Sequence, residues 1–252
     1  MDSLPSQPNN SLIAGFRCLE EIVRAEKAIG SRELARKLDW SHARVNRLIG
    51  TLAYLGLLER DENRRYRPGQ ALHALAAQSI SNSRLIAAAL PIVKELGLQG
   101  QTVGLGTLWH YSVCYFINER PGRTIEEAIL RHKLWPADNS ALGVALLADA
   151  WDQQLSLPDQ ALDPQQDGLL PGQPLSVTVP EARERGYAVL RFNKDIVSVG
   201  VTIGSPAIAG LAVSGPHLGA EYVPSLATRL QDAAQQILDR LNQVPDDNIH
   251  DV

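Results

Sequence analysis

The chain has 252 residues, of which 44% are hydrophobic, and its formal net charge at pH 7 is −4. No apolar run approaches the roughly 18–20 residues that span a bilayer, and the first ten residues lack the basic and apolar regions of a signal peptide. The two cysteines form no spaced pair, so neither a disulfide framework nor a zinc site is indicated. We therefore expect a cytoplasmic protein without a metal or another cofactor.

The charge is unevenly distributed along the chain. Residues 11–75 contain 12 Lys/Arg and 8 Asp/Glu, a balance of +4, whereas the other 187 residues contain 12 and 20, a balance of −8. A basic N-terminal part on an acidic body indicates a polyanionic partner for the first part only.

The N-terminal part has the start and stop signals of three helices, which follow a predicted disordered tail at 1–10. A helix is predicted over about 11–25, because Leu12, Phe16, Leu19 and Val23 recur at helical spacing on one face. Ser31 is the predicted N-cap of a second, short helix, which carries its apolar residues inward. The turn 39–41 follows.

The third helix opens at Ser41, a good N-cap, and ends at Gly56, which fits the left-handed position after a helix. Two short strands are then predicted at 57–60 and 65–67, around a turn at 61–64. Helix, helix, turn, helix and hairpin in this order predict a winged helix-turn-helix over residues 11–69.

The rest of the chain mixes helices and strands, which predicts an α+β domain over residues 85–244, a linker helix over 70–84 and a tail at 245–252. The predicted helices are 70–79, 83–96 with a kink at Pro91, 138–150, 180–185 and a terminal one over about 226–241. The predicted strands are 102–108, 112–118, 197–203 and 207–214. Residues 152–174 give no clear signal.

A helix-turn-helix inserts its second helix into the major groove with the N-terminus first, so donors near this tip are candidates for DNA contacts. Arginine can pair with guanine or contact phosphate, asparagine can pair with adenine, and arginine on the wing suits the minor groove. The candidates are Ser31, Arg32, Ser41, His42, Arg44, Asn46, Arg47, Arg64 and Arg65. The alternative is a solvated basic helix in an interaction domain.

The sequence resembles the IclR-type bacterial transcriptional regulators over nearly its whole length. The marks are SRELARKLDWSHARVNRLIGTLAYLGLLERDENRRYRPG (31–69), PADNSALGVALLA (136–148), ARERGYAV (182–189) and LAVSGP (211–216). The resemblance implies a winged helix-turn-helix joined by a linker helix to a GAF-like effector-binding domain. It also implies a homodimer or dimer of dimers, and a small molecule, commonly an organic acid or aromatic catabolite, that adjusts binding to the operator of a catabolic operon.

By the same resemblance, the effector lies in a cup on the sheet. The residues implied to contact it are Trp135, Ser140, Ala141, Leu142, Asn193, Thr202 and Ser214. Asp138 and Val144 stand where the family usually has His and Lys, and Ala212 where relatives can offer a serine. Ordinary packing is the alternative for each of these residues.

The departures predict the chemistry of the effector. A carboxylate at Asp138, in the first turn of the predicted helix 138–150, lowers the positive potential available to an anion. The predicted hairpin 197–214 is rich in Val, Ile and Ala, and aromatic residues surround it: Trp109, Tyr111, Tyr115 and Trp135. We therefore expect a small, largely apolar or weakly polar effector in preference to a di- or tricarboxylate.

Two other functions stay open. In the first, the chain is a regulator without a ligand, whose body only dimerises. In the second, it is an enzyme, with Cys114 as nucleophile and His110 or His132 as base, although a buried structural thiol is the more ordinary interpretation. Gly104-x-Gly106 lacks the third glycine of a dinucleotide loop.

Pairing of subunits through Leu72, Leu75 and Ala76 of the linker helix would favour a palindromic or pseudo-palindromic operator.

Overall fold

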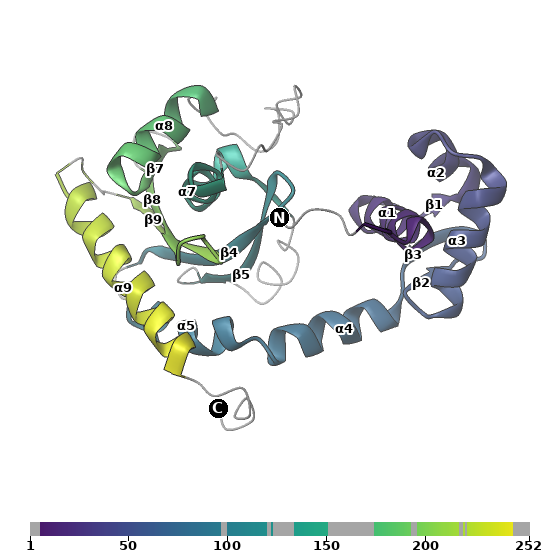
Figure 1. Cartoon of the computed structure of the whole chain (residues 1–252), viewed down its shortest axis with the longest axis horizontal. Coiled ribbons are helices and arrows are strands. Elements are labelled where there is room, and N and C mark those ends of the chain that lie inside the picture. The colour runs from purple at the N-terminus through teal and green to yellow at the C-terminus, as the bar shows by residue number, and fades with distance from the viewer. Residues whose placement is uncertain are drawn as a thin grey trace. The chain divides into compact units, whose positions relative to one another are not determined.

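The computed structural model describes residues 6–96, 100–119, 122, 134–150, 174–192, 196–216, 219 and 221–243. The chain divides into two compact units, Met1–Asn82 and Ser83–Val252, and each is described by itself (Figure 1). None of the helices in the described ranges has the length and apolar character needed to cross a membrane.

The first unit is a winged helix-turn-helix. Its helices are α1 (Asn10–Arg24), α2 (Ser31–Leu38), α3 (His42–Tyr54) and α4 (Gln70–Ser81), and its strands are β1 (Ile29–Gly30), β2 (Leu58–Arg60) and β3 (Arg65–Pro68). The strands form an antiparallel sheet in the order β1-β3-β2. The buried core takes residues from α1, α2, α3 and the sheet, among them Cys18, Leu34, Val45, Ile49 and Leu58.

The predicted ends of α3 are confirmed. The Ser41 hydroxyl accepts a hydrogen bond from the Arg44 amide at 3.4 Å, as an N-cap does. At the other end Gly56 has φ +72°, its amide donates to the Ala53 carbonyl at 3.0 Å, and the Leu57 amide donates to the Leu52 carbonyl at 3.0 Å. These two hydrogen bonds, together with a left-handed glycine, form a Schellman motif.

Two predictions about the N-terminal helices are wrong. Ser31 does not cap α2: Gly30 is the N-cap, and Ser31 is the first helical residue. The predicted stripe of α1 is also not its core face, because Leu12, Phe16 and Val23 are exposed. The buried face of α1 consists of Ala14, Cys18, Leu19 and Ile22. Its 14–18–22 spacing is equally helical, and packing against α3 and β3 selects it.

The second unit is an α+β domain built on one six-stranded antiparallel sheet, in the order β6-β5-β4-β9-β8-β7. Its strands are β4 (Thr102–Trp109), β5 (Ser112–Glu119), β6 (Trp135–Pro136), β7 (Ala188–Arg191), β8 (Ile196–Ile203) and β9 (Ala209–Pro216). Its helices are α5 (Arg84–Leu96), the 3-10 helix η1 (Ala137–Asn139), α7 (Ala141–Ala150), α8 (Leu175–Arg185) and α9 (Val223–Gln243).

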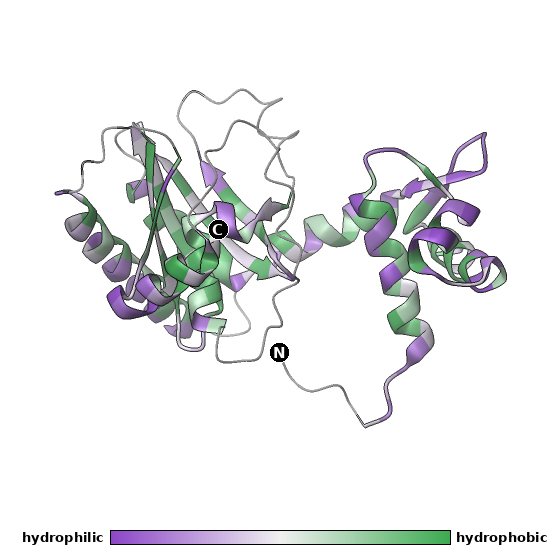
Figure 2. Cartoon of the chain, turned by 90° about the horizontal axis from the view of Figure 1, so that it is seen from above, coloured by the Kyte–Doolittle hydropathy of each residue, from purple (hydrophilic) through white to green (hydrophobic). Residues whose placement is uncertain are grey.

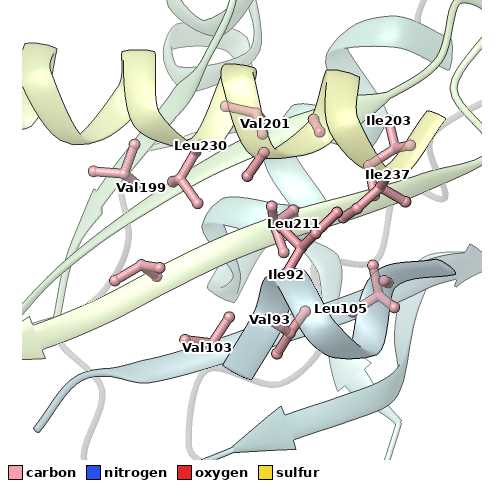
Figure 3. Close-up of a cluster of buried hydrophobic side chains, with 14 of the residues drawn as sticks. Ile92, Val93, Val103, Leu105, Val199, Val201, Ile203, Leu211, Leu230 and Ile237 are labelled. Carbon is pink, nitrogen blue, oxygen red and sulfur yellow. The ribbon is translucent and has the colours of Figure 1, made fainter. Parts of the chain in front are cut away.

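The two faces of this sheet have separate cores. On one face, alternate residues of β4, β8 and β9 pack against α5 and α9, as Figure 3 shows for Val199, Val201, Leu211, Leu230 and Ile237. On the other face, α7 and α8 enclose a second core. Figure 2 shows hydrophobic residues gathered on the strands and the inner helix faces, with hydrophilic residues along the outer sides of the helices.

The contact between α7 and the sheet explains why β8 and β9 carry glycine at two positions. A Cβ at Gly200 would lie 2.4 Å from the backbone carbon of Ala141, and one at Gly210 would lie 2.7 Å from Cγ of Leu142. Because these distances are shorter than any real contact, the first turn of α7 can rest on β8 and β9 only where side chains are missing.

Several predicted boundaries shift. The predicted helix 138–150 is a 3-10 turn followed by α7, and α8 begins five residues before the predicted 180. The predicted helix 83–96 is confirmed as α5, which contains Pro91. The strands β1, β6 and β7 were not predicted. The longest of these three is β7, with four residues, and β1 and β6 have two each, so all three are too short to show a period in the sequence.

Candidate DNA-binding and effector sites

The helix that the sequence predicts to enter the major groove is α3. Val45 and Ile49 are buried in the core, and Arg44, Asn46 and Arg47 are exposed. Since each helical residue turns the side chain by about 100°, the residues that lie opposite the buried face can be assigned. They are Ala43, Arg47, Gly50 and Tyr54, all exposed. Ser41 is the N-cap at the tip of α3, where its hydroxyl accepts from the Arg44 amide.

Tyr54 was missed by the sequence prediction. Its side chain is 89% exposed, which is unusual for an aromatic residue, and it lies on the same face as Arg47. The spacing of 4, 3 and 4 residues from Ala43 through Arg47 and Gly50 to Tyr54 is visible in the sequence and could have identified it.

Arg44 is held at the start of α3 by the residue that precedes the cap. Its guanidinium carbon lies 4.4 Å from the centroid of the Trp40 ring, a cation–π contact. Trp40 also borders a hollow of about 530 Å³, together with Arg32, Ala35, Arg36, Asp39 and His42. The sequence prediction did not include Arg36 or Trp40.

The tips of α2 and α3 are joined by their first residues. The Ser31 hydroxyl and Nε2 of His42 are 2.9 Å apart and form a hydrogen bond, and both residues are candidates for DNA contacts. Ser31 is therefore placed beside the recognition helix, although it is not the cap that the sequence predicted.

The two adjacent arginines of the wing have different environments. Arg64 is exposed at the turn, in the left-handed conformation with φ 60°. Arg65 is used inside the unit: its Nε donates to the Ala28 carbonyl at 2.6 Å, and its Nη2 donates to Glu33 at 3.0 Å. Its amide also donates to the Asp61 carboxylate at 2.8 Å, which closes the wing turn. The structure thus gives Arg65 contacts with the loop before β1 and with α2.

In the second unit, Ser140 organises the start of α7. Its carbonyl and hydroxyl accept hydrogen bonds from the amides of Val144 (2.8 Å) and Gly143 (3.1 Å), so it is the cap of α7. Its hydroxyl also bonds with the Tyr115 hydroxyl at 2.7 Å. Burial raises the pKa of Tyr115, an effect that the bond to Ser140 reduces, so the phenol is neutral and can donate. Ala141 and Leu142 are buried.

Trp135 lies beside this cap. Its indole nitrogen donates to the Asn139 carbonyl at 2.7 Å, and its ring packs against the second core with Tyr111 and Tyr115. The predicted first side of the cup, Trp135 and residues 140–142, is therefore one compact group. Of the four predicted aromatic residues, Trp109 is not part of this core and stacks on His110 instead, with 5.2 Å between the ring centroids.

Strand register shows which residues lie on the sheet side of the predicted cup. Ser214 pairs with Thr102 on β4 and with Ser198 on β8, so the three side chains share the face that α7 covers. The Ser214 hydroxyl donates to the Ser198 hydroxyl at 2.7 Å. Sequence analysis missed Ser198, whose position follows only from the register of β8 and β9.

Thr202 lies away from Ser214. It pairs with Gly210, four residues along β9 from Ser214, and lines a separate groove of about 310 Å³. Asp149, Arg183 and Tyr187 also border this groove. Asn193 lies outside the described residues.

Two arguments for an apolar effector are wrong. The Val and Ile residues of the 197–214 hairpin face α5 and α9, and its other face carries serine, threonine, glycine and alanine. Asp138 lies in η1 and not in the first turn of α7, so the dipole argument does not apply to it. One oxygen of its carboxylate, Oδ1, is buried and has no hydrogen-bond partner among the described residues.

Burial works against the enzyme hypothesis, in which Cys114 is the nucleophile. Cys114 lies within β5, opposite Thr107, and burial raises the pKa of its thiol, which disfavours the thiolate. His110 occupies the turn after β4 with its ring against Trp109, and His132 lies outside the described residues. Within the described ranges, no three His, Cys, Asp or Glu side chains are grouped to hold a metal ion.

Comparisons with known proteins agree with this architecture. Residues 12–62 match the family model of the IclR helix-turn-helix domain. The HTH-type transcriptional regulator BhcR of Paracoccus denitrificans is 26% identical over 220 residues, which cover 81% of this chain and 79% of BhcR.

Solved structures share the fold of the whole chain. An IclR family transcriptional regulator from Brucella abortus superposes with a TM-score of 0.69 at 21% identity, covering 95% of this chain and 94% of that chain. An IclR homolog from Microbacterium hydrocarbonoxydans, complexed with 4-hydroxybenzoate, superposes with a TM-score of 0.63 at 21% identity, covering 92% of this chain and 100% of that chain.

Proposed function

Because the chain is an IclR-type transcriptional regulator, we propose that it contacts its operator through α3 and the wing, and that a small molecule on the α7-covered face of the six-stranded sheet sets its affinity for DNA. The observation that supports this DNA interface is the exposed face of α3, where Arg47 lies opposite the buried Val45 and Ile49. Arg44, Asn46, Ser41 and His42 flank this face at the tip.

Replacing Arg47 tests the placement of the recognition helix. Arg47→Ala removes a side chain that is exposed and makes no contact in the core, so the fold stays intact while operator binding falls by about tenfold or more. The control is Arg17→Ala, which removes an exposed arginine of α1 in the same unit. Binding is measured at several salt concentrations, because phosphate contacts make affinity fall steeply with salt. Wild-type affinity in Arg47→Ala would place the interface elsewhere.

The proposed effector is a small molecule with hydrogen-bonding groups and little charge. The α7-covered face offers the hydroxyls of Tyr115, Ser140, Ser198 and Ser214, and its described strand residues include no lysine or arginine. Such a lining satisfies hydroxyl and carbonyl groups better than several carboxylates, which need cations. The relative that holds 4-hydroxybenzoate, an aromatic molecule with a hydroxyl and one carboxylate, supports this class.

A thermal-shift panel tests this class. A ligand at 100 times its Kd stabilises a protein by about 2.7 kcal/mol, so a true effector raises the melting temperature measurably. Hydroxylated aromatic monoacids and neutral phenols are expected to act, and Ser214→Ala is expected to weaken their effect. A dicarboxylate that raises the melting temperature, with no response to phenols, would contradict the proposal.

A regulator without a ligand is the second candidate. The close packing of α7 on Gly200 and Gly210 favours it, because this part of the face has no room for another molecule. The same panel separates the candidates: a ligand-free regulator responds to no metabolite. In either case we propose a cytoplasmic homodimer or dimer of dimers on a palindromic or pseudo-palindromic operator, with control of a catabolic operon and no enzymatic activity.

A further inference from the structure

Gly50, in the middle of α3, has no role in the fold of the first unit. A Cβ built on it meets no atom within 4 Å, and its backbone is helical. Two other glycines of the unit differ in this respect. Gly56 has the positive φ that the end of α3 requires, and a Cβ at Gly69 would lie 2.2 Å from the Gly56 carbonyl oxygen. Only Gly50, of these three, could become alanine without strain or collision.

A glycine in this position also weakens the helix. Glycine loses more backbone entropy on folding than alanine does, and it leaves the helical backbone more open to water. The chain therefore carries an unfavourable residue at an exposed position of α3, where the folded unit gains nothing from it. Gly15 of α1 is equally free of neighbours, so this cost alone does not identify a role, and the position of Gly50 on α3 has to supply it.

The neighbours of Gly50 indicate what this role is. Arg47 precedes it by three residues and Tyr54 follows it by four, so all three lie on the face opposite the core. Two long side chains that can donate hydrogen bonds thus stand on either side of a bare stretch of backbone. Phosphate oxygens along DNA accept hydrogen bonds, and a glycine allows the helix backbone to approach them closely.

We propose that Gly50 is the point of closest approach between α3 and operator DNA, with Arg47 toward the bases and the Tyr54 hydroxyl donating to a phosphate beyond it. This inference rests on the proposed placement of α3 in the groove. It extends the DNA contact of α3 from its tip to its last residue.

The test is Gly50→Ala in the full chain, which separates stability from DNA binding. Alanine strengthens the helix, so the melting temperature of the first unit is expected to rise by about 2–8 °C. The added methyl keeps the helix away from DNA, so operator affinity is expected to fall by about tenfold. A variant that is more stable and yet binds more weakly cannot be explained by damage to the fold.

Gly15→Ala is the matched control. Gly15 lies within α1, and a Cβ there also meets no atom within 4 Å. Its substitution is expected to raise the melting temperature similarly and to leave operator affinity within about twofold of wild type. Tyr54→Phe, which removes only the hydroxyl, is expected to lower affinity by about three- to tenfold.

Three results would overturn the inference: wild-type operator affinity in Gly50→Ala, a lower melting temperature of that variant, or a changed oligomer mass by light scattering, which would assign Gly50 to a protein contact. Arg47→Ala distinguishes this failure from failure of the proposed function. If Arg47→Ala loses binding while Gly50→Ala does not, only the close approach is wrong; if neither loses binding, α3 is not the recognition helix.

Discussion

Trp40 contacts Arg44, a predicted DNA contact, without belonging to the predicted contact set itself. Its ring lies under the Arg44 guanidinium at 4.4 Å and also packs against the core of the first unit. An exposed arginine otherwise samples many rotamers and loses that entropy on binding. The Trp40 ring restricts Arg44 before DNA arrives, so we expect the two residues to be energetically coupled.

A double-mutant cycle of Trp40→Phe and Arg44→Ala measures this coupling. Phenylalanine keeps most of the packing but is the weaker cation–π partner, so Trp40→Phe is expected to reduce operator affinity by about two- to threefold. In the Arg44→Ala background the same change is expected to have no effect, with a coupling of about 0.5 kcal/mol. Equal effects in both backgrounds would show that Trp40 only packs.

We expect Cys18 to make the first unit less stable at alkaline pH. Burial raises the pKa of its thiol from 9.0 to about 11, and the nearby Arg44 charge partly offsets this rise. When the pKa of a group is higher in the folded state than in the unfolded state, its contribution to stability is fully present below the unfolded-state pKa. The contribution is lost as the pH rises through the folded-state pKa. The sensitive window is therefore pH 9 to 11.

Cys18→Ala removes the titrating group. We expect the variant to be less stable than wild type near pH 7, by about 1 kcal/mol because of the lost packing, and the difference to shrink between pH 9 and 11. Urea unfolding followed by far-UV circular dichroism at several pH values measures it. Parallel pH profiles for the two proteins would contradict the burial of this thiol.

The wing shows how adjacent residues of one element take different tasks. Arg64→Ala removes an exposed side chain at the turn, whereas Arg65→Ala breaks the bonds to the Ala28 carbonyl and to Glu33. We expect Arg64→Ala to weaken operator binding by about three- to tenfold at low salt with unchanged stability. Arg65→Ala is expected to lower stability by about 1–2 kcal/mol.

Thermal unfolding and operator titrations on both variants test this division. Arg65→Lys is the control for charge, since lysine keeps the positive charge but not the two directed bonds of the guanidinium. If Arg64→Ala lowers the melting temperature and Arg65→Ala does not, the division between the two arginines is reversed.

At the scale of the whole molecule, the first unit exposes apolar side chains that its own fold does not use. Leu75 on α4 is 60% exposed, and no residue of α4 is buried. Leu72, which the sequence predicted to share the pairing surface, packs against the core of its own unit. Exposed apolar surface of this kind on a helix is typical of an interface between subunits.

We expect the chain to be at least dimeric and Leu75→Glu to weaken this assembly. Light scattering at micromolar concentration measures the mass, and a palindromic operator is expected to lose affinity in the variant because two half-sites are no longer bound together. Gln78→Glu is the control, since it adds the same charge on α4 without removing an apolar side chain. A monomeric wild-type chain that binds its operator tightly would exclude the predicted pairing.

The sequence by itself determined the features that depend on neighbouring residues. The cap at Ser41, the left-handed Gly56, the turn before α3 and the positions of most helices follow from local hydrogen bonds and from side-chain periodicity. A family resemblance carried by such motifs gave the winged helix-turn-helix and the α+β body. It also gave Trp135 and residues 140–142 as one group, since they are contiguous or nearly so in the chain.

Only the tertiary structure decided between alternatives that have the same local pattern. In α1 two apolar stripes have helical spacing, and the packing of α3 and β3 selects 14–18–22. In β8 and β9 both faces are free of charged residues, and the position of α7 over Gly200 and Gly210 decides that Ser198 and Ser214 lie on its side. Arg64 and Arg65 have identical side chains, and the nearby Ala28 and Glu33 engage one of them. Each choice depends on contacts between residues far apart in the chain, which local periodicity does not contain.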